Sequence, residues 1–224
     1  MEKEKYIPEV KSQLRSRSVQ VPEVIYKASG IKILGIRIKS LLFSTDVAII
    51  KNNNANSIIA VYPFTPQLSI IQSILEVAPV PVFAGVGGGL TTGKRAVAIA
   101  LQAELLGAYG VVINAPTALD VIEDMRNAID IPIISTIASL KDDYRAKLNA
   151  GVSILNVSGG ANTANIVRKI RSEYGKELPI IATGGPTDET ILETIDAGAN
   201  AITYTPPTSA EIFAQVMKNY RGED

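Results

Sequence analysis

The chain has 224 residues, in which 22 lysines and arginines balance 22 aspartates and glutamates, and it contains neither cysteine nor histidine. This length suits one (β/α)8 barrel, and zero net charge provides no basic field for nucleic-acid binding. Without cysteine there are no disulfides, thiolate metal sites or cysteine nucleophiles. Without histidine the usual general base and the commonest zinc ligand are missing, so we predict no metal ligand set.

The N-terminal part, residues 1–39, is expected to be a helical extension ahead of the barrel. Residues 1–18 carry mixed charge without the apolar core of a signal peptide, and no later segment has about 18 uncharged apolar residues in a row. We therefore expect a cytoplasmic protein without membrane contact. Residues 21–39 are apolar at helical spacing, which predicts that they plug the barrel floor or pack beside it.

Residues 40–224 are expected to form the barrel. Short runs rich in valine and isoleucine alternate with longer segments of helical composition, a pattern typical of a parallel sheet covered by helices. The eight runs are 40–44, 57–62, 81–86, 110–114, 132–136, 153–157, 179–183 and 201–205. Runs three, five and seven begin with proline, whereas runs four, six and eight are entered through Gly110, Gly151 and Gly198, so a two-strand, two-helix unit recurs roughly every 45 to 50 residues.

Asp46 is the only carboxylate close to the end of a run that is not already placed in a helix. It is a candidate acid or base, or alternatively the cap of the helix that begins at DVAIIKNN. No paired carboxylates at useful spacing are visible, which disfavours glycosidase chemistry. Lysines beyond Lys51 fall in expected loops or helices, which disfavours a Schiff-base aldolase.

The loop after run three contains Gly88 to Lys94, which fits G-x-x-x-x-G-K, but Arg95 stands where a P-loop has serine or threonine. A nucleoside triphosphatase is therefore not expected. The glycines predict a mobile loop that closes over an anionic ligand and brings Lys94 to it as a second acid or base; a flexible loop with solvated basic residues is the alternative.

Further polar residues are expected at the mouth, where the strands end. Asn114 and Asn156 are amides at or inside apolar runs, and each needs a hydrogen-bond partner or is destabilised by about 1 to 3 kcal/mol. Asn114 is a candidate for orienting substrate, while Asn156, Tyr62, Gly88 and Tyr204 are candidates for binding it. Polar pairing between strands is the alternative for the amides.

Glycine-rich loops follow the last three runs, and phosphate is often held after strands seven and eight of such barrels. The candidate phosphate-binding residues are Ser158, Gly159, Gly160, Thr183, Gly184, Gly185 and Thr205. Glycine lets the backbone approach an anion, and the helix that follows directs free N–H groups at it. The alternative is that these glycines only form tight turns.

The segment IIATGGPTDETILETIDAGANAIT resembles the strand-seven-to-strand-eight region of the ribulose-phosphate-binding barrels, which include thiamine-phosphate synthase and N-acylmannosamine-6-phosphate epimerase. About 50 residues resemble that family well and the other runs only loosely. The resemblance implies the fold and a phosphate position, but no particular reaction. It is weaker at the last run, where Tyr204, Thr205, Pro206 and Pro207 replace the usual Gly-Ser or Gly-Thr.

These patterns favour an enzyme that acts on a small phosphorylated metabolite, of isomerase, epimerase or lyase type, with no required cofactor. An FMN-dependent oxidoreductase and a non-catalytic binding or regulatory barrel are the alternatives. Magnesium held by Asp46 and a ligand phosphate is a further option. The third helix, within TTGKRAVAIALQAELLG, is apolar almost all round, which suggests that a second subunit covers it in a homo-oligomer.

Overall fold

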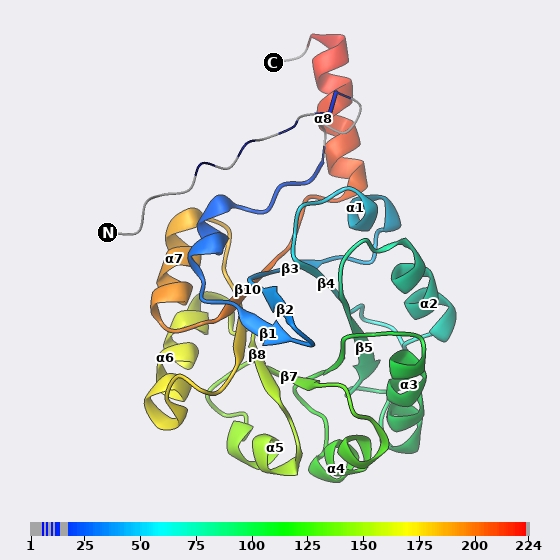
Figure 1. Ribbon diagram of the computed structural model, residues 1–224, viewed down its shortest axis with the longest axis vertical. Helices are drawn as coiled ribbons and strands as arrows, with labels where there is room; N and C mark the ends of the chain where they lie inside the picture. Colours follow the sequence, from blue (N-terminus) through cyan, green and yellow to red (C-terminus); the bar gives the residue numbers. More distant parts are fainter. Residues whose placement is uncertain (1–5, 7, 9, 11, 14–17, 223–224) are drawn as a thin grey trace.

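The computed structural model describes residues 6, 8, 10, 12, 13 and 18–222. Eight parallel strands close into a barrel in the order β10-β3-β4-β5-β6-β7-β8-β9 (Figure 1). They are β3 (Ser40–Phe43), β4 (Ser57–Ala60), β5 (Val82–Gly87), β6 (Gly110–Ile113), β7 (Ile133–Ile137), β8 (Ile154–Val157), β9 (Ile180–Thr183) and β10 (Ala201–Tyr204). Each strand overlaps one of the expected runs, so the predicted (β/α)8 barrel is confirmed.

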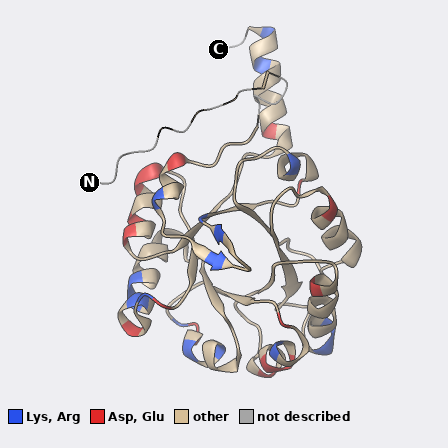
Figure 2. Cartoon of the chain, viewed as in Figure 1, with Lys and Arg blue, Asp and Glu red and all other residues tan. Residues whose placement is uncertain are grey.

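Helices follow the strands in the described part of the chain; α1 to α7 form an outer ring, whereas α8 extends away from the barrel (Figure 1). They are α1 (Val47–Lys51), α2 (Leu68–Val77), α3 (Gly93–Leu105), α4 (Leu119–Ala128), α5 (Tyr144–Ala150), α6 (Thr163–Tyr174), α7 (Asp188–Asp196) and α8 (Ser209–Arg221). Two 3-10 helices, η1 (Glu23–Lys27) and η2 (Gly160–Asn162), precede β1 and α6. Charged residues lie on these helices, whereas the barrel strands carry none (Figure 2).

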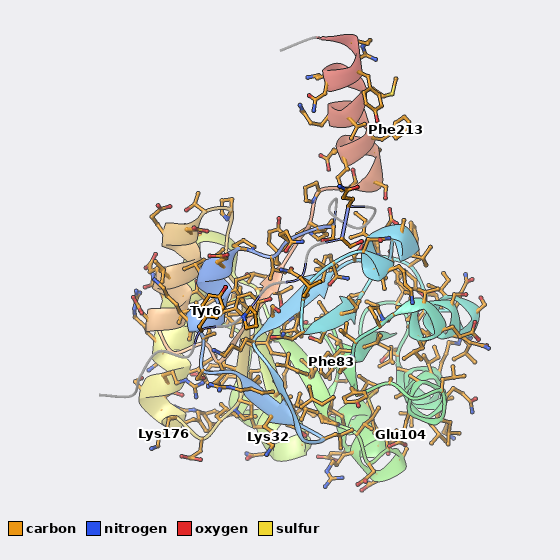
Figure 3. All side chains as sticks on the ribbon, turned by 45° about the horizontal axis from the view of Figure 1, so that its top comes forward. Tyr6, Lys32, Phe83, Glu104, Lys176 and Phe213 are labelled. Carbon is orange, nitrogen blue, oxygen red and sulfur yellow. The ribbon has the colours of Figure 1, made fainter. Side chains whose placement is uncertain are left out.

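The barrel strands are buried on both faces. Successive side chains point alternately toward the helices and toward the barrel interior. One set of alternate residues, such as Ile58, Leu155 and Ile202, packs under the helices in the larger core cluster. The other set forms a second cluster inside the barrel, where Phe83 is fully buried (Figure 3). The assignment of each residue to the interior or to the helix side follows from this alternation.

A β-hairpin, not a helix, occupies residues 31–38. Strands β1 (Ile31–Ile33) and β2 (Ile36–Ile38) pair antiparallel through a turn in which Leu34 and Gly35 both have positive φ, 46° and 86°. Ile31, Ile33 and Ile38 join the cluster inside the barrel, and Gly30 N–H donates to the Asn200 carbonyl just before β10. The hairpin therefore closes the amino-terminal end of the barrel (Figure 1).

The expected plug is thus present, but its predicted helical conformation is wrong for residues 28–39. The isoleucines on each side of the turn alternate with lysine and arginine, and this period of two suits a strand that buries one face. Only η1 is helical between residues 18 and 39. Most of residues 1–17 lie outside the described part of the chain, so the structure does not test the expectation for them.

Helix α3 buries a face of small residues, Ala96, Ala100 and Ala103, against the barrel. Its half-buried Val97 and Ile99 also pack against the core. Much of its apolar surface is thus covered within the chain, and a second subunit over α3 stays a prediction. In the described part of the chain no helix has the length and apolar character needed to cross a membrane.

Candidate functional site

Four neutral polar side chains lie in a row across β7, β8, β9 and β10, facing the barrel interior at the mouth. Thr136 is in register with Asn156, and Thr183 is in register with Thr203. Each follows, two residues later, a residue that belongs to the cluster inside the barrel, so all four point inward. The row offers three hydroxyl groups and one amide to whatever enters the mouth.

Two atoms of this row are buried without a hydrogen-bond partner among the described residues. They are the Asn156 Oδ1 and the Thr203 Oγ1, on side chains that are each 8% exposed. A buried polar atom left unpaired costs about 1 to 3 kcal/mol, so such atoms usually have a partner such as water or ligand. A third unpaired atom, Ser135 Oγ, alternates with the inward residues and faces the helices.

A cavity of ≈ 1150 Å³ opens above β9 and β10 beside this row. Its lining includes Gly160, Thr163, Thr183, Gly184 and Gly185, from the loops after β8 and β9. The Thr163 and Thr183 hydroxyl oxygens are 3.3 Å apart, so the two loops meet at this point. The predicted glycine loops of the last strands are therefore brought together around one cavity.

Three helices begin at this cavity, and their N-termini differ. Helix α7 is capped by Thr187 with two acidic residues in its first turn, and α8 is capped by Thr208 with Glu211 in its first turn. Helix α6 has no side-chain cap at Asn162 and no acidic residue in its first turn. The Asn162 and Thr163 N–H groups are engaged within η2, so an anion is favoured most at the start of η2, which leads into α6 and where no carboxylate offsets the helix dipole.

The glycines around this cavity also have packing reasons. A Cβ at Gly159 would lie 2.4 Å from Ile166 Cδ1, and one at Gly184 would lie 2.7 Å from Ile191 Cγ1 and 2.8 Å from Ile202 Cγ2. Gly185 has φ +83° and would meet Thr190. Gly159 and Gly184 thus let α6 and α7 pack closely, so a glycine pair alone does not identify a phosphate site.

Other candidate phosphate residues lie around the same loops. Ser158 donates its N–H to the Ile137 carbonyl at 2.9 Å, which extends the sheet by one residue. Thr205 is exposed and lines the large cavity. Tyr204 also lines that cavity, but it lies on the helix side of β10 and packs against the larger core cluster, not into the mouth.

A second, smaller cavity of ≈ 330 Å³ lies over β4, β5 and β6. Tyr62 and Asn114 line it, together with Gly85 and Val61. The Tyr62 hydroxyl accepts a hydrogen bond from Gln67 N–H at 2.8 Å, and the exposed Asn114 leaves its side chain at the cavity. Both residues therefore lie at the mouth, and their roles in orienting and binding substrate stay predictions.

The glycine loop after β5 is tied to the loop after β6. Asn114 N–H donates to the Gly87 carbonyl at 3.0 Å, and Gly88 N–H donates to the Thr91 carbonyl at 2.8 Å. Gly88 has φ +106°, and a Cβ there would lie 2.1 Å from Thr117 Oγ1. This close packing accounts for Gly88 without a ligand, and the mobility of the rest of the loop stays a prediction.

Asp46 serves as the N-cap of α1. Its Oδ1 accepts hydrogen bonds from the N–H groups of Ala48 and Ile49, and its Oδ2 accepts one from the Ser209 hydroxyl. The Ser209 hydrogen bond, followed by these backbone hydrogen bonds, lowers the pKa of Asp46 against the opposing effect of burial. The geometry favours the capping alternative, because both carboxylate oxygens are engaged and the charged form is held.

The three residues predicted for acid or base work and substrate orientation do not meet. Lys94 is exposed in the first turn of α3 and is not among the residues lining either mouth cavity. Among the described residues, no hydrogen bond or ion pair joins Asp46, Lys94 and Asn114. Their catalytic roles stay predictions.

Sequence reasoning missed Thr163, Thr203 and Lys147. A period of two through β10 would have placed Thr203 beside Ala201 on the inner face. Lys147 gave no signal, because it lies in α5, yet it is only 5% exposed and its Nζ donates to the Ala115 carbonyl at 2.6 Å. Burial lowers the pKa of Lys147, with Asp142 acting in the opposite direction.

The two carboxylates that line the large cavity both have partners, since Glu193 pairs with Arg168 and Glu211 accepts from the Thr208 hydroxyl. The described residues contain no group of three or more aspartates and glutamates placed to hold a metal ion. Asp46 uses one oxygen to cap α1 and the other to accept from the Ser209 hydroxyl. These residues do not fit a protein-held magnesium ion, which prefers one or two free carboxylates.

No protein-family model matches the chain, and no curated protein matches it. Among solved structures, 2,3-dimethylmalate lyase, a PEP mutase/isocitrate lyase superfamily member, has TM-score 0.62 and 12% identity, covering 89% of this chain and 84% of its own. Phosphoenolpyruvate phosphomutase from Streptomyces platensis subsp. rosaceus has TM-score 0.61 and 12% identity, covering 88% and 83%. Phosphonopyruvate hydrolase, complexed with oxalate and Mg++, has TM-score 0.60 and 13% identity, covering 83% and 80%.

These similar structures are not the ribulose-phosphate-binding barrels that the sequence resembles. At such low identity the likeness shows the fold alone. The comparisons therefore establish a (β/α)8 barrel of the kind that these lyase, mutase and hydrolase structures share.

Proposed function

We propose that the protein is an enzyme that acts on a small phosphorylated metabolite, of isomerase, epimerase or lyase type. The phosphate binds at the start of α6, between the loop after β8 and the loop after β9. The remainder of the substrate extends into the barrel mouth. The observation that carries this proposal is the pair of buried unpaired atoms, Asn156 Oδ1 and Thr203 Oγ1, beside an uncapped helix N-terminus.

Each part of this site has a chemical task. The N–H groups at the start of η2, which leads into α6, and the hydroxyl of Thr183 donate to phosphate oxygens. The Asn156 Oδ1 can only accept, so it suits a hydroxyl of the substrate, whereas the Thr203 hydroxyl both donates and accepts. A substrate with a phosphate at one end and hydroxyl or carbonyl groups at the other satisfies all of these groups.

The similar structures support this class of substrate in a limited way. Two of them carry phosphonopyruvate or phosphoenolpyruvate in their names, which are small phosphorus-containing compounds. One contains magnesium, but the donors in this chain do not fit that ion, and we route no step through a metal. Any proton transfer falls to a side chain outside the neutral row, and Asp46 and Lys94 stay the predicted candidates.

A non-catalytic binding barrel is the second candidate. It is favoured by the absence of an ionisable side chain from the inward row of Thr136, Asn156, Thr183 and Thr203. In this case the same phosphorylated compound binds and stabilises the protein but is not turned over. The two candidates therefore share a ligand and differ only in whether product appears.

The test measures the melting temperature with inorganic phosphate and with a panel of sugar phosphates, for the wild type and for Thr183→Val. This substitution keeps the shape of the side chain and removes its hydroxyl, so we expect about tenfold weaker binding. Thr65→Val is the matched control, because Thr65 is exposed at the smaller cavity. Equal stabilisation of both variants would overturn the placement of the phosphate.

A further inference from the structure

The smaller cavity over β4, β5 and β6 is uncharged and has an apolar floor. Val61 and Val112 belong to the packed cluster inside the barrel and form this floor together with Gly85. No lysine, arginine, aspartate or glutamate of the described chain lines the cavity, and its polar side chains are the neutral Tyr62, Thr65, Thr91 and Asn114. A charged group placed there would lose hydration without gaining an oppositely charged partner, so the cavity does not suit a second phosphate or a carboxylate.

Two large apolar side chains stand exposed at the same cavity. Phe64, in the loop after β4, is 75% exposed, and Leu90, in the loop after β5, is fully exposed. A single exposed apolar residue needs no explanation, but these two come from neighbouring loops and line one hollow. An apolar group bound between them would remove both from water, which is favourable.

The loop that carries Phe64 is held in place before any ligand binds. The Tyr62 hydroxyl accepts a hydrogen bond from the Gln67 N–H at 2.8 Å, which closes the base of the loop. Pro63 and Pro66 restrict the backbone on each side of Phe64. This wall of the cavity is therefore preorganised, and little conformational entropy is lost when a ligand covers it.

The smaller cavity lies across the mouth from the proposed phosphate position. In the closed barrel β5 is four strands from β9 in either direction, so the two cavities face each other (Figure 1). Eight strands about 4.8 Å apart, tilted by about 36°, close into a ring about 15 Å across. A ligand with its phosphate over β8 and β9 reaches the smaller cavity only if it carries a chain of several atoms.

We propose that the smaller cavity binds the apolar end of the same phosphorylated ligand. The substrate class is then an elongated monophosphate with an uncharged aliphatic or aromatic group at the far end, not a bisphosphate. The apolar end lies between Phe64 and Leu90, and the hydroxyl or carbonyl groups lie between the two ends, next to Asn156 and Thr203. This inference rests on the proposed function, because the phosphate position sets the direction of the ligand.

The first test compares methyl, butyl and octyl phosphate by isothermal titration calorimetry, each below its micelle concentration. Methyl phosphate reports on the phosphate position alone, and only the octyl chain is long enough to cross the mouth. Each methylene group that leaves water for an apolar cavity strengthens binding about threefold, so octyl phosphate should bind about tenfold or more tightly than butyl phosphate. Equal affinities of butyl and octyl phosphate would overturn the inference.

The second test removes both apolar walls with Phe64→Ser/Leu90→Ser. Both side chains are exposed, so the melting temperature without ligand should not change. The variant should lose the gain of octyl over butyl phosphate and keep its affinity for methyl phosphate. Leu119→Ser/Leu140→Ser is the matched control, because these leucines are 42% and 51% exposed and line neither cavity. A gain that survives the first variant, or that the control also loses, would contradict an apolar site at this cavity.

A third measurement separates this inference from the proposed function. Thr183→Val should weaken the binding of all three phosphates by the same factor, about tenfold, because it acts at the phosphate end. If Thr183→Val weakens none of them while Phe64→Ser/Leu90→Ser still weakens octyl phosphate, the phosphate placement is wrong and the apolar site stands. The uncharged probe 1-octanol should shift the NMR methyl signals of Leu90 and Val112 in the wild type and in Thr183→Val alike. Unshifted signals would show that the cavity takes no apolar group.

Discussion

The two halves of the barrel mouth differ in what they present to a ligand. Across β7 to β10 the inward residues nearest the mouth are the polar row of Thr136, Asn156, Thr183 and Thr203. Across β3 to β6 the corresponding positions are Phe43, Val61, Gly85 and Asn114, of which only Asn114 is polar. One half can make hydrogen bonds with a ligand, whereas the other offers mainly apolar contact. A ligand held across the mouth therefore needs one strongly polar end, which must lie over β8 to β10.

The glycines of the two halves should respond differently to substitution. Gly184→Ala places a Cβ against Ile191 and Ile202, so we expect the free energy of unfolding to fall by about 1 to 3 kcal/mol. Gly89→Ala is the control in the other half, because a Cβ there meets nothing within 4 Å, and we expect little change. Urea unfolding measures both. Equal stability of the two variants would show that Gly184 has no packing role.

The polar row is expected to lower the free energy of unfolding of the ligand-free protein. Asn156→Leu removes a buried unpaired atom, so we expect the free energy of unfolding of the ligand-free protein to rise, by about 1 to 2 kcal/mol. The same variant should lose its stabilisation by the phosphorylated ligand. Val61→Leu in the other half serves as control, and it should keep that stabilisation. A destabilised Asn156→Leu would indicate that the amide already has its partners in the free protein.

Asp46 tests whether the first half of the mouth contributes chemistry. Asp46→Ala removes the cap of α1, so the free energy of unfolding should fall by up to about 1 kcal/mol at neutral pH. Because folding lowers the pKa of this carboxyl, its stabilisation is complete above the ordinary value of 3.8 and is lost as the pH falls through the lowered value. The wild type and the variant should converge in acid. If the variant folds normally but turns over no substrate, Asp46 is catalytic and the capping interpretation is incomplete.

The barrel could be predicted from the sequence because its strand runs recur at regular spacing and start at a proline or a glycine. Both residues favour the end of one helix and the start of the next strand. Residues 31–38 were predicted to be helical, because their isoleucines fit helical spacing. The same isoleucines also alternate with charged residues, which is the pattern of the observed hairpin. Asn156 could be recognised as an amide in an apolar run. The direction of α8 could not be predicted, since it depends on contacts such as the Ser209 to Asp46 hydrogen bond, which joins residues 163 positions apart.

The hairpin at the floor has a consequence for the order of events in the mouth. Ile31, Ile33 and Ile38 continue the packed cluster that fills the barrel interior, so a ligand can reach the inward row only from the mouth. A molecule bound against the inward row must arrive before anything that binds above it and must leave after it. Any reaction with two substrates or two products at this site would therefore follow a compulsory order, and the molecule that contacts Asn156 would be the first to enter and the last to leave.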